Sequence, residues 1–251
     1  MSAYRMVTVD EDPSLVKLWN DIEAGAFQEY NDHGDVLSDD WHRLVEDFDE
    51  FQFVLFEGDE PVGLGQTIPF VWDGTVRDLG DGIDEVFQRG FADRKSGYEP
   101  TALCALLGVA APAWRSKGVS PDIVRSMGEI AARHGLADLV APVRPNLKRA
   151  YPLTPIDRYM RWTRGDGRPL DPWLRVHVRL GAEFLAPAPR SMKITGTVEE
   201  WETWTGVAMP ESGEYLFEDA LAPVVIDRER DLGTYYEPNV WMIHRGIGRR
   251  Q

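Results

Sequence analysis

The stretch ALCALLGVAAPAWRSKGVSPDIVRSMGEIAAR, residues 102–133, decides the fold of this chain. Its apolar first ten residues are typical of a buried strand, and its last third has the apolar spacing of an amphipathic helix. Between them, Gly118 lies in a loop, and Ser120, Pro121 and Asp122 predict a helix start capped by Ser120. Such a junction presents free backbone N–H groups and the positive end of a helix dipole. It therefore predicts a site for a phosphate or pyrophosphate.

The segments on either side complete an α/β pattern. Residues 138–143, DLVAPV, predict a strand parallel to the first one, joined to it by the helix in a right-handed βαβ unit. Upstream, residues 51–56 and 61–70 predict a β-hairpin. Helical spacing over residues 12–30 and 38–48 places two helices before that hairpin.

The rest of the chain adds elements to this unit. A short helical pattern over residues 83–94 predicts an insertion around residues 75–98. Further helices are predicted over residues 156–162 and 172–180 and between Thr197 and Gly206, and strands over residues 191–195, 221–226 and 239–244. We predict a single domain over residues 1–251, with an elaborated C-terminal region around residues 196–251.

Composition narrows the function classes. The net charge of −15 disfavours nucleic acid and anionic membranes as partners, since both attract clustered Lys and Arg. The single cysteine, Cys104, excludes internal disulfides and a cysteine-based zinc site, and fits a reducing cytoplasm. The longest uncharged stretch, Pro100–Trp114, has 15 residues and is too short to span a bilayer, and the N-terminus shows no apolar signal core. We expect a cytoplasmic protein.

The loop of residues 115–120 resembles that of the GCN5-related N-acetyltransferase (GNAT) superfamily. That family places an Arg/Gln-x-x-Gly-x-Gly/Ala loop between its fourth strand and third helix, and Arg115, Gly118 and Ser120 occupy the three positions. Ser120 departs from the small residue usual there, and Pro121 removes the next N–H donor. The resemblance covers most of residues 10–195. It implies a mixed, mostly antiparallel central sheet flanked by helices, with the βαβ unit at its centre.

The resemblance also implies the cofactor, acetyl-CoA, and a direct transfer of its acetyl group to an amine of a small molecule. Backbone groups would line the pantetheine arm, and the loop would hold the pyrophosphate, with Lys117, Gly118 and Ser120 as donors. The residues assigned to this site are Val109, Ala110, Ala111, Arg115, Ser116, Lys117, Gly118, Val119, Ser120 and Asn146. No metal is predicted, because the acidic residues 32–42 match no ligand spacing and indicate a hydrated loop.

The chemistry needs a base for the amine and a proton for the departing thiolate. In the family a tyrosine four residues before a glycine often supplies that proton, and counting back from Gly181 gives His177. Its imidazolium could protonate the thiolate, or its neutral imidazole could take the amine proton. Tyr151 and Tyr159 are competing acids, and Glu99, just before the central strand, is the candidate base. Cys104 is interpreted as a buried apolar residue rather than a nucleophile.

Two alternatives stay open. The absence of the expected tyrosine fits a non-catalytic acyl-CoA-binding module, and the same fold could use a longer acyl-CoA or an acyl carrier protein as donor. The acidic composition favours a cationic acceptor, and the sequence is compatible with a homo-oligomer.

Overall fold

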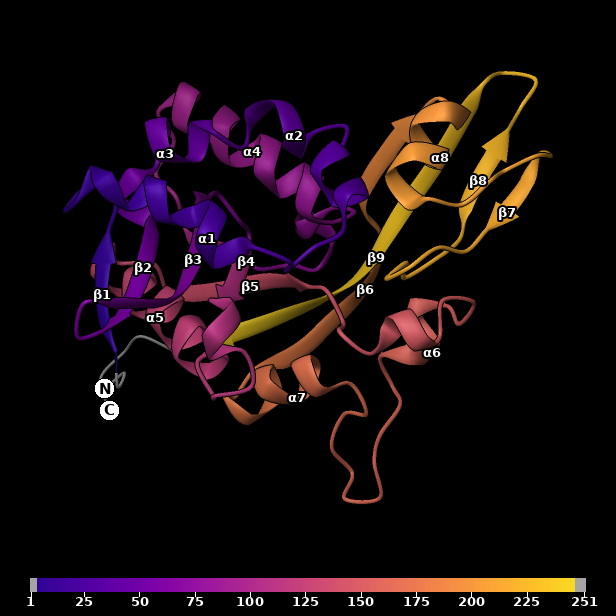
Figure 1. The fold of residues 1–251 in the computed structure, drawn as a ribbon. Helices are drawn as coiled ribbons and strands as arrows, with labels where there is room; N and C mark the ends of the chain where they lie inside the picture. The colour runs from indigo at the N-terminus through magenta and orange to yellow at the C-terminus, as the bar shows by residue number, and fades with distance from the viewer. Residues whose placement is uncertain (1–3, 247–251) are drawn as a thin grey trace.

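The computed structural model describes residues 4–246, which form one nine-stranded sheet with helices on both faces (Figure 1). The strand order is β1-β2-β3-β4-β5-β9-β8-β7, and β6 pairs with β9. Every pairing is antiparallel except β4 with β5, so the predicted mixed, mostly antiparallel sheet is confirmed. The strands are β1 (Arg5–Thr8), β2 (Gln52–Glu57), β3 (Glu60–Phe70), β4 (Ala102–Ala110), β5 (Asp138–Val143), β6 (Glu183–Gly196), β7 (Gly213–Tyr215), β8 (Val224–Asp227) and β9 (Leu232–Arg245).

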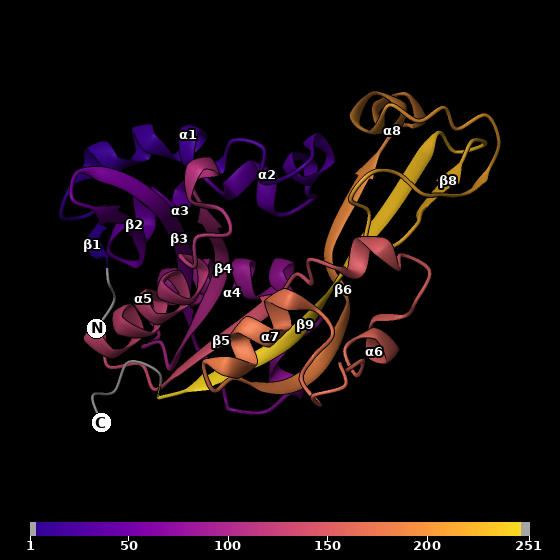
Figure 2. The same ribbon diagram turned by 60° about the horizontal axis from the view of Figure 1, so that its bottom comes forward.

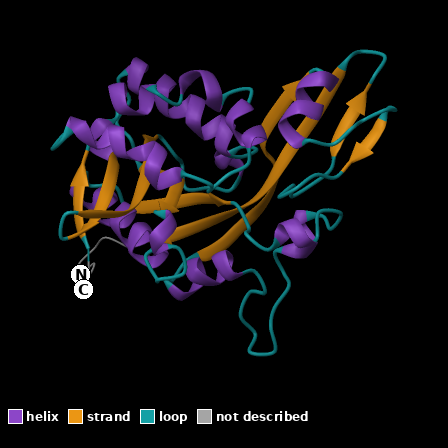
Figure 3. Ribbon diagram, viewed as in Figure 1, coloured by secondary structure: helices purple, strands orange, loops and turns teal. Residues whose placement is uncertain are grey.

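The helices form two layers, which Figures 2 and 3 show from two sides. One face of the sheet carries α1 to α4, and the other carries α5 and α7, which contact each other. The helices are α1 (Trp19–Glu23), α2 (Leu37–Asp40), α3 (Arg43–Asp47), α4 (Ile83–Ser96), α5 (Ser120–Arg133), α6 (Ile156–Tyr159), α7 (Pro172–Arg179) and α8 (Val198–Thr205). Within residues 4–246, no helix has the length and apolarity needed to cross a membrane.

Several local predictions are confirmed. The hairpin of β2 and β3 is present, and Gly181 follows α7 with a φ of 88°, as a helix-ending glycine should. Thr197 and Glu200 form the full capping box at the start of α8. The helical pattern predicted over residues 83–94 is the helix α4. It is fixed at both ends, since Ile83 N–H donates to Ser191 Oγ (3.0 Å) and Asp93 accepts from Val71 N–H (2.8 Å).

Three local predictions were wrong. The helix expected over residues 12–30 is a 3₁₀ turn followed by α1, and Gly25, with a φ of 63°, turns the chain after Glu23. The helix expected over residues 38–48 is split into α2 and α3. Ser120 is the first residue of α5 and does not cap it, because Val119 before it already has helical backbone angles.

The C-terminal region builds an arm on the core sheet. β6 and β9 are 14-residue strands that pair with each other in the core and continue beyond it, where α8, β7 and β8 join them. The arm is tied to the core by a buried group in which Arg144 donates to Glu237 (2.9 Å) and to the hydroxyl of Tyr30 (3.0 Å). Burial by itself would lower the pKa of Arg144, but the combined effect of Glu237, Tyr30 and Tyr235 raises it. These contacts fix the end of β5 relative to β9.

Candidate active site

The parallel strands β4 and β5 separate along their length. Their pairing covers three residue pairs and ends at Cys104 and Val140. Beyond that point β4 keeps its partner β3 and β5 keeps its partner β9, so the two backbone edges that face each other are free. Free strand edges carry unpaired N–H and C=O groups, which an extended ligand can pair with. We call this part of the sheet the strand opening.

A β-bulge lies at the start of the strand opening. Gln66 of β3 pairs with Leu107 and Thr67 pairs with Ala105, so Leu106 is an extra residue in β4. A bulge twists its strand and turns backbone groups away from the regular ladder. Its position, two residues after the last pair with β5, explains why β4 leaves β5 there.

The loop from β4 to α5 follows the strand opening. Ser116 and Gly118 have φ angles of 67° and 88°, which turn the chain towards α5. The backbone N–H groups of Gly118, Val119 and Ser120 have no hydrogen-bond partner among residues 4–246, whereas that of Lys117 donates to Trp114 O (3.1 Å). Of the three predicted donors, Lys117, Gly118 and Ser120, only the N–H of Lys117 therefore already has a backbone partner. Three adjacent free donors at a helix start suit an anion.

Arg115 holds this loop in place. Its guanidinium donates to three backbone carbonyls, those of Ala24 (2.7 Å), Gly25 (3.0 Å) and Ala110 (3.3 Å). The sequence predicted Arg115 as one of the cofactor-binding residues. In the structure its hydrogen bonds link the end of β4 to the turn after α1.

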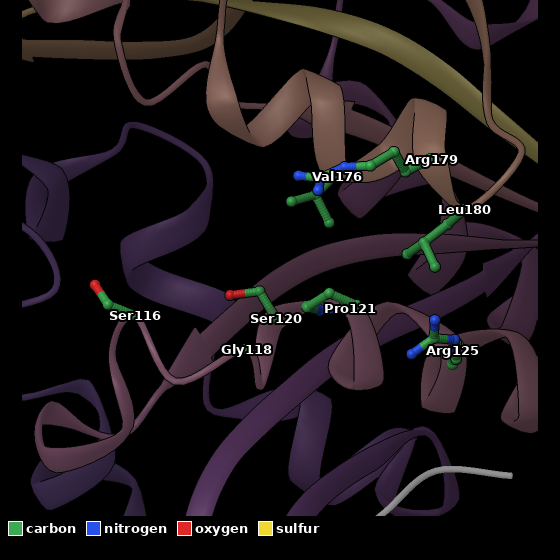
Figure 4. A pocket seen from close by; sticks show the side chains of 8 residues that line it. All are labelled: Ser116, Gly118, Ser120, Pro121, Arg125, Val176, Arg179 and Leu180. Carbon is green, nitrogen blue, oxygen red and sulfur yellow. The ribbon is translucent and has the colours of Figure 1, made fainter.

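A cavity of about 440 Å³ lies between this loop and α7 (Figure 4). Its lining combines residues from the loop, from α5 and from α7, namely Ser116, Gly118, Ser120, Pro121, Arg125, Val176, Arg179 and Leu180. Arg125 also pairs with Asp122 (3.0 Å). The positive charge at the cavity therefore comes from Arg125 of α5 and Arg179 of α7, which the sequence did not predict as site residues. Helical spacing could have indicated that Arg125 lies at the site, because it follows Pro121 by four residues. The position of Arg179 follows only from the contact between α5 and α7.

The other residues predicted to bind the cofactor differ in their exposure to solvent. Val109 and Ala111 are buried and Ala110 is half-buried at the end of β4. Lys117 is exposed, with its Nζ 4.7 Å from the centre of the Trp114 ring. Asn146 is exposed in the segment after β5, outside the lining of the cavity.

An apolar cluster lies beside the strand opening, between the sheet and α6 and α7. It contains Ala141 and Val143 from β5 and Leu174 from α7, and Trp173 and Ala105 pack against it. Ala105 is the first residue of β4 without a partner on β5. The cluster therefore gives the strand opening a water-poor wall, where electrostatic interactions are strong.

His177 projects from α7 onto the sheet and is 3% exposed. Its Nδ1 lies 2.9 Å from Nε2 of His244 in β9, and its ring contacts Trp173 edge-on. Burial, with a smaller contribution from His244, lowers the pKa of His177 to about 3. The imidazole is therefore neutral at pH 7. A pKa this low argues against the imidazolium acid, and it also makes the imidazole a weak proton acceptor at pH 7.

The predicted base, Glu99, lies before the end of β4 that is paired with β5. It is exposed in the segment before Ala102, whose partner is Asp138 at the paired end of the two strands. The strand opening begins at Ala105, three strand residues or about 10 Å beyond Ala102. This placement leaves Glu99 outside the strand opening.

The two tyrosines differ in their hydrogen bonds. Tyr159 is buried and its hydroxyl donates to Asp171 (2.9 Å); burial first, and then Asp171, raise the pKa of Tyr159. Tyr151 is 39% exposed, and its hydroxyl has no partner among residues 4–246. The Tyr151 ring packs on Trp162, which belongs to the edge of the apolar cluster. Tyr151 is therefore the freer proton donor.

Cys104 behaves as expected for an apolar core residue. It is fully buried in the paired part of β4, and burial raises the pKa of its thiol far above the usual range. No group of three or more metal-ligating side chains occurs in the described part of the chain.

Comparisons with known proteins bear on the family and the fold. No family model matches the sequence. The chain is 30% identical over 233 residues to the arginine N-acetyltransferase avaD of Aspergillus versicolor, and the match covers 81% of this chain and 80% of that protein. The fold is similar to that of the loading GNATL domain of CurA from Lyngbya majuscula, with a TM-score of 0.61 and 15% identity over 98% of this chain and 99% of that one.

A second solved structure, the GphF GNAT-like decarboxylase in complex with isobutyryl-CoA, gives a TM-score of 0.59 and 16% identity over 96% of this chain and 99% of that one. At these identities the two structures support the fold alone. The match to the arginine N-acetyltransferase covers most of both chains and shows the family. The protein belongs to the GCN5-related N-acetyltransferase superfamily of acyltransferases, as its loop suggested.

Proposed function

We propose that this protein transfers the acetyl group of acetyl-CoA to an amine of a small cationic molecule. The observation that carries the proposal is the strand opening between β4 and β5, which continues into three free loop N–H groups and a cavity with two arginines. Acetyl-CoA has an extended pantetheine arm and an anionic pyrophosphate, so it needs a free strand edge followed by an anion-binding site. The similarity to an arginine N-acetyltransferase supports the amine acceptor.

The cofactor would be held by backbone groups along its length. The free edge of β4 after Cys104 would pair with the amides of the pantetheine arm, and the N–H groups of Gly118, Val119 and Ser120 would donate to the pyrophosphate. Arg125 and Arg179 would supply countercharge, which the chain as a whole lacks at a net −15. The bulge at Leu106 would place a backbone N–H near the thioester carbonyl, where it stabilises the developing oxyanion.

One side chain would supply a proton. The proton that the amine loses after it attacks the thioester carbon would go to solvent, because the pKa of His177, lowered to about 3 by burial, makes its imidazole a weak acceptor. Tyr151, whose hydroxyl is free, would protonate the departing thiolate. Tyr159 is a poorer donor to the thiolate because its hydroxyl already donates to Asp171.

A cationic acceptor fits the charge of the chain. The net charge of −15 raises the local concentration of small cations at its surface, so it favours their encounter with the protein. The relative acts on arginine by its name, and arginine carries both a reactive amine and a guanidinium. We propose arginine and related diamines as the first acceptors to test.

The test follows thiol release from acetyl-CoA in the presence of an amine panel that includes arginine, agmatine, spermidine and an uncharged amine. We expect turnover with cationic amines and acetyl-CoA, and weaker turnover with isobutyryl-CoA. Calorimetric binding of coenzyme A without turnover on any amine would favour the non-catalytic module. Turnover only with a carrier-protein thioester would show that the donor is an acyl carrier protein rather than acetyl-CoA.

A further inference from the structure

We propose that a second cavity, at the start of α4, binds the cationic end of the acceptor through the carboxylate of Asp84. The proposal rests on the proposed function, because this cation is the far end of an amine that is acetylated at its other end. It adds a binding residue in α4, a helix that holds none of the predicted site residues. The supporting observations are the cavity, a carboxylate oxygen without a partner, and the charges around it.

The second cavity has a volume of about 300 Å³ and lies between α4 and the strands β6 and β9. We call it the α4 cavity. Polar and charged side chains border it on two sides, namely Asp81, Asp84 and Glu85 at the start of α4 and Arg190, Ser191 and Lys193 in β6. It is therefore a site for a polar or charged ligand rather than an apolar one.

The α4 cavity lies beside the end of β5, where the strand opening ends. Ser191, which is fully buried and borders the cavity, accepts a hydrogen bond from the side-chain amide of Asn239 (3.0 Å). The next residue of β9, Val240, pairs with Val143 at the end of β5, and neighbouring strands are about 5 Å apart. The helix α4 covers the face of the sheet opposite to α5 and α7. An acceptor in the α4 cavity would thus approach the strand opening from the face opposite to the cavity of Figure 4.

Asp84 has a carboxylate oxygen without a partner. Its Oδ2 accepts from the backbone N–H of Lys193 (2.8 Å), whereas its Oδ1 is buried and makes no hydrogen bond to any residue in the range 4–246. Buried polar groups are normally satisfied, and an exception needs an explanation. An N–H group of a ligand in the α4 cavity would satisfy this oxygen.

The side chains near Asp84 do not compensate its charge. The ammonium group of Lys193 pairs with Asp35 instead (3.1 Å). Burial, opposed by the N–H and the charge of Lys193 and reinforced by Asp35 and Glu237, raises the pKa of Asp84 to about 7. A bound cation favours the ionised carboxylate and would offset the effect of burial.

The other charges at the α4 cavity also favour a cation. Asp81 and Glu85 make no ion pair with the described residues, and neither does Arg190, whose guanidinium carbon lies 4.1 Å from the centre of the Tyr236 ring. Together with Asp84, the unpaired carboxylates outnumber the unpaired arginine. Charged hydrogen bonds are stronger than neutral ones, and a guanidinium can donate to both oxygens of a carboxylate.

Agmatine and arginine have the chemistry that this arrangement requires. Each carries a guanidinium at one end and a primary amine at the other, joined by a flexible carbon chain. The guanidinium would bind Asp84, and the amine would extend towards the thioester in the strand opening.

The first test measures binding without turnover. Calorimetry with agmatine, on the protein saturated with coenzyme A, should show an affinity that falls by roughly 10- to 100-fold in Asp84→Asn, because a charged hydrogen bond becomes a neutral one. Asp93→Asn is the matched control, since Asp93 is also a half-buried residue of α4 that accepts from one backbone N–H (2.8 Å), and it does not border the cavity. Unchanged affinity in Asp84→Asn, or an equal loss in both variants, would overturn the proposal.

The second test uses kinetics. In Asp84→Asn, KM for agmatine should rise by a similar factor, whereas KM for acetyl-CoA and for butylamine, which has no second charged group, should stay the same. Equal effects on agmatine and butylamine would contradict a site for the far end of the acceptor.

The third test uses pH. The affinity of the wild-type protein for agmatine should increase from pH 6 to pH 8 by up to about 10-fold, because Asp84 ionises around pH 7, and Asp84→Asn should lack this increase. A wild-type affinity that is equal at pH 6 and pH 8 would contradict the role of Asp84. The binding tests do not depend on turnover. They therefore separate this inference from the proposed function, which fails if no amine is acetylated.

Discussion

Substitution of Gly118 by Asp tests the phosphate site, because the added carboxylate should weaken the binding of coenzyme A. Gly118 has a φ of 88°, where an L-residue costs about 1–2 kcal/mol, and a Cβ built there meets no heavy atom within 4 Å. A typical domain has about 5–15 kcal/mol of stability, so the variant should fold with a modestly lower melting temperature. Its new carboxylate would lie beside the free N–H groups of Val119 and Ser120.

The expected loss of affinity comes from charge. A carboxylate about 5 Å from one phosphate charge, at an effective dielectric constant of about 20, is repelled by about 3 kcal/mol. That corresponds to a weakening of coenzyme A binding by roughly 100-fold. Gly118→Ala is the matched control, because it carries the same backbone strain without the charge. Calorimetry should show a small loss for Ala and the large loss for Asp, reduced at high salt.

Two results would refute this reasoning. Unchanged coenzyme A affinity in a folded Asp variant would remove Gly118 from the phosphate site. Equal losses in the Ala and Asp variants would show that the loop acts through its shape alone, and that no anion lies near residue 118.

Three further predictions address other parts of the molecule. Tyr151→Phe should lower kcat by roughly 100-fold with little change in coenzyme A affinity, which steady-state kinetics and calorimetry would separate; an unchanged kcat would remove Tyr151 as the acid. Arg115→Ala removes hydrogen bonds to Ala24 O and two other carbonyls, and should lower the unfolding free energy by about 1 kcal/mol in urea. Burial raises the pKa of Asp84 to about 7, above its unfolded value, so the free energy of unfolding falls as pH rises from about 4 to about 7 and levels off above pH 7, where the carboxyl is ionised in both states. The stability gain of Asp84→Asn over wild type should therefore grow between about pH 4 and pH 7 in denaturant titrations, and a gain that stays constant over this range would contradict this.

Local patterns in the sequence predicted the core elements well. The apolar run of β4, the helical spacing of α5 and the hairpin of β2 and β3 depend on neighbouring residues, and such contacts are encoded over short distances. The same holds for the capping box at Thr197. The long helix predicted over residues 12–30 was wrong, because apolar spacing continued through Gly25, where the backbone turns.

Local features of the sequence, a glycine and the helix start that follows it, predicted the candidate site around Gly118. The hydrogen bonds of Arg115 could not be predicted, since their acceptors, Ala24 and Gly25, lie about 90 residues away. Glu99 was predicted to lie near the acceptor because it precedes β4. Only the register of β4 with β5 shows which end of β4 is open.

The sequence by itself determined a strand, a glycine loop and a helix that can bind an anion, and through them the family. Only the tertiary structure decided where β4 and β5 separate, which face of α7 meets the loop, and that His177 lies on His244. The physical reason is that hydrogen bonding and helix propensity act between near neighbours. The strand opening and the histidine pair come from contacts between segments far apart in the chain, and these form only when the whole core packs.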